Sequence, residues 1–169
     1  MNYFELFALP VQLRVDKIAL RQKFFALSRQ SHPDRFAQDS AAAQEQALET
    51  AAHLNKAYKT LTDDEGILKY VLQEKGLLEE EEKYTLPPDF LMEMMELNEA
   101  VSEAETTPEK NGLQSQLQNL KKELYEPVEA IIENYREGIT TEKELLQVKD
   151  YYFKKKYLQR LAQQLNQML

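Results

Sequence analysis

The fold is decided by residues 16–61, which read DKIALRQKFFALSRQSHPDRFAQDSAAAQEQALETAAHLNKAYKTL. Both halves of this stretch have helical spacing of apolar and small residues, at Leu20, Phe24, Leu27 and Ser31 and at Ala47, Ala51, Leu54, Tyr58 and Leu61. Asp16 is a natural N-cap. Pro33 disfavours a helical His32, so the first helix must end there. The pattern therefore predicts an antiparallel helical hairpin with a short connecting loop.

The rest of the chain is also predicted to be helical, which makes the protein all-α. Only four of the 169 residues are glycine, and the good helix formers Ala, Leu, Gln, Glu and Lys dominate. We expect helices over about 2–9, 16–31, 40–61, 64–75, 89–105 and 109–137, with Pro127 inside the sixth. Thr141 and Glu144 form a capping box for a seventh helix. This order divides the chain into an N-terminal domain (1–76), an acidic, Pro-containing linker (77–88) and a three-helix bundle (89–169).

The composition excludes several classes of function. The chain has no cysteine and two histidines, so disulfides, thiolate chemistry and thiolate-bound metal sites are out, and we expect no cofactor or metal. No apolar run approaches the ~18 residues of a membrane span, and no signal peptide is evident at the start. We therefore expect a cytoplasmic protein without membrane contacts.

The net charge of −8 argues against nucleic-acid binding, which requires a basic surface. The charge is uneven: residues 1–62 hold eight basic and six acidic residues, a net +2, so residues 63–169 carry −10. Such a division suggests two surfaces with different partners, although compositional scatter would also produce it.

The most specific local signal is His32-Pro33-Asp34 between the two hairpin helices. A histidine beside an aspartate could serve hydrolysis, but this requires a nucleophile or a second carboxylate nearby, and the sequence offers none. We therefore expect no enzymatic activity. A proline-terminated helix with a surface aspartate would explain the tripeptide equally well if it stood alone. Its setting distinguishes it, since it joins two amphipathic helices after a short aromatic helix near the N-terminus.

With these flanks, residues 2–72 resemble a J domain, the module that stimulates ATP hydrolysis by DnaK-class chaperones. The resemblance is carried by the tripeptide with Arg35, by Phe24 and Leu27, and by the segments Tyr3-Phe4-Glu5-Leu6-Phe7-Ala8-Leu9 and Asn55-Lys56-Ala57-Tyr58-Lys59-Thr60-Leu61. It implies that Asp34 contacts an arginine of the chaperone, while His32 and Pro33 hold the loop shape. It also implies that the outer face of the second helix docks on the chaperone.

A helical wheel at ~100° per residue predicts which residues form that outer face. It places Arg21, Phe25 and Arg29 roughly opposite the core edge marked by Phe24 and Leu27. A basic face suits an acidic partner surface. Without the tripeptide, these arginines would be read as merely solubilising the helix.

The fifth predicted helix is apolar on two sides. Phe90, Met94, Leu97 and Val101 form one stripe. The opposite side combines apolar and acidic residues, namely Leu91, Met92, Met95, Glu96, Glu99 and Glu103. Such a helix is either sandwiched in a larger core or presents one face to a partner. Phe153 likewise lies opposite the core stripe of the last helix.

The whole chain is similar to HscB-type co-chaperones of iron–sulfur cluster assembly, and to the bacterial type, because the N-terminal cysteine pairs of some eukaryotic relatives are absent. The resemblance implies two partners, an HscA chaperone of the DnaK class and an IscU-type scaffold. It assigns scaffold contacts to Leu91, Met92, Met95, Glu96, Glu99, Glu103 and Phe153. The alternative is a J protein whose bundle binds a different client.

Overall fold

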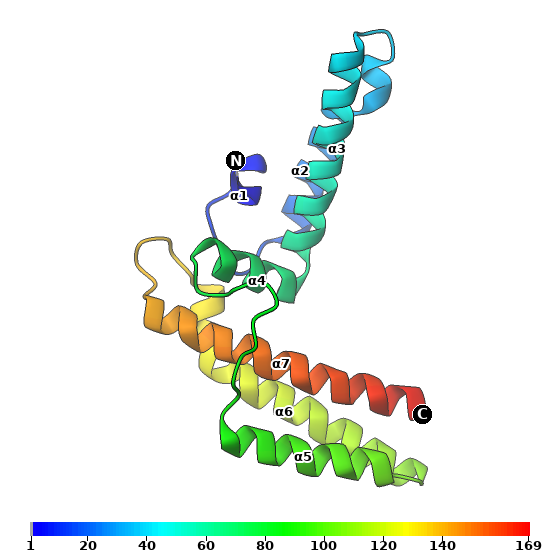
Figure 1. The fold of residues 1–169 in the computed structure, drawn as a ribbon, viewed down its shortest axis with the longest axis vertical. Helices are drawn as coiled ribbons and strands as arrows, with labels where there is room; N and C mark the ends of the chain where they lie inside the picture. The colour runs from blue at the N-terminus through cyan, green and yellow to red at the C-terminus, as the bar shows by residue number, and fades with distance from the viewer. Residues whose placement is uncertain (1) are drawn as a thin grey trace.

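The computed structural model describes residues 2–169, which contain seven α-helices, one short 3-10 helix and no strand (Figure 1). The helices are α1 (Tyr3–Leu6), α2 (Lys17–Ser31), η1 (Pro33–Phe36), α3 (Ala41–Thr62), α4 (Asp64–Glu74), α5 (Pro88–Glu103), α6 (Thr107–Glu133) and α7 (Glu142–Met168). The all-α prediction is confirmed. Within the described residues, no helix has both the length and the apolar character needed to cross a membrane.

Helices α2 and α3 form the predicted hairpin, whose loop end projects away from the other helices (Figure 1). The Asp16 carboxylate accepts the N–H groups of Ile18 and Ala19 at the start of α2. Between the helices, the Phe24 ring stacks on Tyr58 with centroids 4.2 Å apart. The hairpin is thus defined by a capping residue at its start, aromatic packing along its length and a proline at its turn.

The connection from α3 to α4 is a single residue, Asp63, whose carboxylate accepts the Gly66 N–H at 3.1 Å. A Cβ at Gly66 would lie 3.0 Å from the Thr60 carbonyl oxygen, so glycine permits this close approach. Gly76 follows the last turn of α4 with φ +71°, in the left-handed region typical of a helix end.

Helices α5, α6 and α7 pack together, and Phe90, Met94, Leu97 and Val101 of α5 are buried as predicted. Helix α6 continues through Pro127, also as predicted. The capping box of Thr141 and Glu144 begins α7.

Two predicted helix ends were wrong. Helix α1 stops at Leu6 instead of Leu9, because Ala8 takes a positive φ of 53°. Helix α6 stops at Glu133 instead of Glu137. The Tyr135 side chain beyond it is buried, and the turn closes when the Arg136 N–H donates to the Thr140 hydroxyl.

One hydrophobic core joins the hairpin region to the ends of α6 and α7 that extend beyond α5. We call this junction the elbow. Its buried residues come from α4 (Ile67, Leu68, Val71, Leu72), from α6 and the following turn (Val128, Ile132, Tyr135), and from α7 (Leu145, Val148, Tyr151, Tyr152). Burial of a large apolar side chain contributes about 1.5–3 kcal/mol, so packing at the elbow holds the hairpin at one orientation to the bundle.

Polar contacts surround the elbow. Arg14 pairs with Glu133 at 3.2 Å and donates to the Tyr125 hydroxyl. Lys75 pairs with Glu137 on the turn after α6. Such partly exposed pairs contribute little to stability individually, but they set the register between surfaces that the apolar core holds together.

Candidate partner-binding surfaces

The tripeptide lies in the loop at the far end of the hairpin. His32 leaves the helical region with φ −61° and ψ 133°, as Pro33 requires, and η1 begins directly after it. The His32 Nδ1 accepts the Asp34 N–H at 3.2 Å, which requires this nitrogen to be unprotonated. The ring thereby fixes the backbone of the aspartate.

The Asp34 carboxylate is turned to solvent, with 93% of its side chain exposed. Among residues 2–169, the one group with a possible positive charge within ion-pair distance of it is the His32 ring, at 3.5 Å, and a neutral ring leaves the carboxylate unpaired. The loop therefore presents an almost completely exposed acceptor on a backbone that proline and histidine constrain. This arrangement suits a charge-assisted hydrogen bond to a cationic group of a partner.

The predicted outer face of α2 is exposed. Arg21 and Arg29 point away from the core, and Phe25 is 46% exposed. The Arg21 guanidinium lies 5.3 Å from the centre of the Phe25 ring, an arrangement that keeps an aromatic side chain and a charge together at the surface. Phe24 and Leu27 pack on the core side, so the wheel assigned the two faces correctly.

Helix α5 is not sandwiched within the bundle. Met92 and Met95 are 63% and 66% exposed, Leu91 is half-buried, and the predicted acidic residues beside them are exposed at Glu96, Glu99 and Glu103. Among residues 2–169 no other helix covers this side of α5. The structure therefore brings these six residues together on one apolar, acid-rimmed surface, which we call the α5 face.

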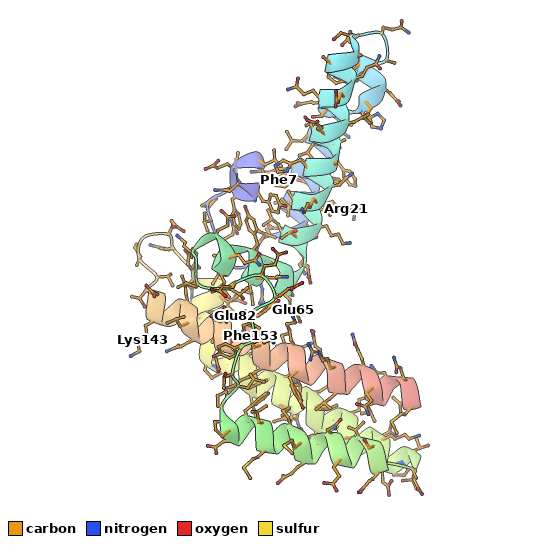
Figure 2. The ribbon with its side chains drawn as sticks, in the orientation of Figure 1. Phe7, Arg21, Glu65, Glu82, Lys143 and Phe153 are labelled. Atoms are coloured by element: carbon orange, nitrogen blue, oxygen red, sulfur yellow. The ribbon has the colours of Figure 1, made fainter. Side chains whose placement is uncertain are left out.

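Phe153 has a different environment. Its ring stacks on Tyr84 of the linker, with centroids 4.5 Å apart and planes 9° apart, and it meets Tyr152 edge-on. Figure 2 shows Phe153 on α7 beside Glu82, where the linker crosses, rather than on the outer side of α5. The structure thus leaves Phe153 half-buried and apart from the exposed methionines.

Sequence reasoning missed Tyr84, which holds the linker against α7. Its hydroxyl donates to the Asp150 carboxylate at 2.8 Å, and burial together with this bond raises the pKa of Tyr84 to about 12. Glu82 pairs with Lys149 at 2.7 Å, and this contact holds the pKa of Glu82 below its usual value. The sequence feature that could have indicated this contact was a lone tyrosine in an acid-rich linker.

A hairpin with an exposed His-Pro-Asp loop, joined to a helical bundle, defines the class of J-domain co-chaperones. A family model described as "HSCB C-terminal oligomerisation domain" matches residues 86–166. A "Co-chaperone protein HscB homolog" of Cupriavidus taiwanensis is 37% identical over 123 residues, which are 72% of this chain and 70% of that protein. The chain belongs to the HscB family of co-chaperones, which are not enzymes.

Further matches are to proteins of the same family. A "Co-chaperone protein HscB homolog" of Vibrio cholerae serotype O1 (strain M66-2) is 45% identical over 100 residues, which are 59% of this chain and 58% of that protein. The chain thus spans less than two thirds of this relative's length in the match. The solved structure "Chaperone HscB from Vibrio cholerae" aligns with a TM-score of 0.78 at 28% identity, over 99% of this chain and 97% of that one. The "Crystal structure of human co-chaperone protein HscB" aligns with a TM-score of 0.83 at 26% identity, over 99% and 82%.

Proposed function

We propose that this protein binds an IscU-type iron–sulfur scaffold through its bundle and delivers it in the cytoplasm to an HscA chaperone of the DnaK class. It stimulates the chaperone's ATPase through the His32-Pro33-Asp34 loop. The observation that carries the proposal is the pairing, on one frame, of an exposed carboxylate in that loop with an exposed apolar face on α5. Family membership supports both partner assignments.

At the loop, the role of this chain is to present Asp34. A cationic group of the chaperone, which the J-domain resemblance implies is an arginine, would donate hydrogen bonds to the carboxylate and be drawn out of its own contacts. His32 contributes by holding the Asp34 backbone. The basic residues Arg21 and Arg29 speed the encounter with an acidic surface, with a rate that falls as salt rises.

On the bundle, the methionines of the α5 face suit an adaptable apolar contact, because their side chains are flexible and polarizable. The glutamates around them orient the partner more than they strengthen its binding. A scaffold surface with an apolar centre and a basic edge would be complementary to the α5 face. Phe153 contributes to this contact either at the edge of the face or through the linker that stacks on it.

The elbow connects the two functions. Since one core includes both the hairpin base and α6 and α7, a scaffold held on the bundle stays at a defined distance from the loop. Each bound partner then raises the effective concentration of the other.

The test is the steady-state ATPase rate of an HscA-type chaperone, titrated with this protein in the presence and absence of an IscU-type scaffold. The proposal predicts modest stimulation by the protein alone and synergistic stimulation with scaffold. Stimulation that does not depend on scaffold would reassign the bundle to another client. No stimulation would refute the chaperone assignment.

A further inference from the structure

A groove between α6 and α7 is not used by the proposed function. Its floor is apolar, made by Ala162 together with Leu117, Leu158 and Leu165, which are themselves 4%, 3% and 1% exposed, and its rim carries the amides of Gln114, Gln118 and Asn166. It encloses about 210 Å³, enough for aliphatic side chains to enter. Although α5 packs on both α6 and α7, no residue of α5 lines the groove. Figure 1 shows α5 at the side of the bundle farthest from the hairpin.

The groove continues into a basic hollow at the elbow. Gln118, Lys121 and Lys155 line both cavities, and Arg14 and Lys122 join them in the second. The hollow therefore connects the bundle to the segment that precedes α2. Together the two cavities form an elongated site, apolar at one end and basic at the other, which we call the elbow groove.

Its positive charge is only partly balanced. Arg14 pairs with Glu133, Lys155 lies 3.7 Å from Glu65, and the carboxylate of Asp64, which pairs with Lys17, also lines the hollow. Lys121 and Lys122 are exposed, and no carboxylate among residues 2–169 lies within ion-pair distance of either. Since residues 63–169 carry −10 in total, an uncompensated basic site in this half is a local exception and favours an acidic partner.

The elbow groove is continuous with the basic face of α2. Lys17 opens α2 and pairs with Asp64, which lines the basic hollow. Arg21, Phe25 and Arg29 follow at four-residue intervals, so they lie along one side of the helix and lead toward the loop. Figure 2 shows Arg21 low on the hairpin, above α7.

We propose that the chaperone docked on α2 lays an extended, acidic segment with aliphatic side chains into the elbow groove. This inference rests on the proposed function. Lysines attract the carboxylates of such a segment, the amides on the rim bond its backbone, and the apolar floor contacts its aliphatic side chains. The scaffold is the weaker candidate occupant, because a surface suited to the acidic rim of the α5 face would be repelled by Lys121 and Lys122.

The test compares two variants with equal changes in charge. Lys121→Glu with Lys122→Glu reverses the unpaired charges of the groove. Lys83→Glu with Lys143→Glu reverses two exposed lysines elsewhere, one on the linker and one in the first turn of α7, where Figure 2 labels Lys143. Both are measured for stimulation of an HscA-type ATPase at an ionic strength of about 0.15 M, for binding of an IscU-type scaffold, and for thermal unfolding.

The groove variant is expected to raise the half-stimulating concentration about tenfold, with the maximal rate and scaffold binding unchanged. The control should stay within about twofold of the parent protein, because long-range charge effects are screened by salt. An unchanged half-stimulating concentration in the groove variant, or an equal shift in the control, would overturn the inference. Loss of scaffold binding would instead assign the groove to the scaffold. If the unaltered protein does not stimulate the ATPase, both the proposed function and this inference are refuted.

Discussion

The loop at the end of the hairpin and the elbow at its base are built in opposite ways. The loop exposes its functional carboxylate almost completely and holds its shape through one proline and one side-chain hydrogen bond. The elbow buries large apolar residues from three helices, including Ile132 and Val148, and carries its polar contacts at the edge. The contact group of the loop and the rigid core of the elbow are thus built from different residues. A substitution in the loop should therefore leave the fold intact, and a substitution in the elbow should leave the loop carboxylate in place.

The largest effect is expected from Asp34→Asn. The substitution keeps the shape of the side chain and removes its charge, so ATPase stimulation should be lost, because removing one partner of a charge pair that is buried in a complex costs about 2–5 kcal/mol. Thermal stability and scaffold binding should not change, because the side chain is exposed and lies far from the bundle. Loss of scaffold binding in a well-folded variant would show that the two surfaces are not separate.

The second effect concerns the elbow. Ile132 is 1% exposed, and Ile132→Ala should reduce the free energy of unfolding by about 2–5 kcal/mol. Leu48→Ala is the matched control, since Leu48 is 60% exposed and its truncation should be nearly neutral. Urea unfolding of both variants gives the difference. Equal stability would contradict the packing role of the elbow.

The α5 face is expected to give a smaller effect. Met92→Ala with Met95→Ala should weaken scaffold binding by about 1–3 kcal/mol without lowering stability, because both side chains are exposed. Phe153→Ala should lower scaffold affinity and stability together, since it also removes the stack on Tyr84. Calorimetric titration with thermal unfolding separates the two cases. Unchanged binding in the methionine variant would refute the α5 face as the scaffold site.

The smallest effect is the pH dependence of the linker. Lys149 lowers the pKa of Glu82 in the folded state below its ordinary value of 4.5. This contact therefore stabilises the fold above about pH 4.5, and the contribution is lost as the pH falls through the lowered pKa. Glu82→Gln should remove less than about 1 kcal/mol at pH 7 and leave stability unchanged near pH 3. An equal loss at both pH values would contradict the ionic origin.

Most of the fold was predictable because its signals are local. Asp16, Pro33 and the pair Thr141 and Glu144 mark helix ends by short-range capping and sterics. The end of α6 was not predictable, since it depends on burial of Tyr135 in a core formed by residues distant in sequence.

The site shows the same division between local and long-range information. The exposed faces of α2 and α5 follow from helical periodicity. The stack of Phe153 on Tyr84 does not, because the path of the linker is set by its contacts with α7.

The central claim is that one molecule carries both partner surfaces on one frame, and complementation in trans tests it most directly. Asp34→Asn and Met92→Ala with Met95→Ala each disable one surface and leave the other. The two variants are mixed with an HscA-type chaperone and an IscU-type scaffold at concentrations that give half-maximal synergy with the unaltered protein. The account predicts that the mixture does not restore the synergistic ATPase rate. A mixture as effective as the unaltered protein would contradict it.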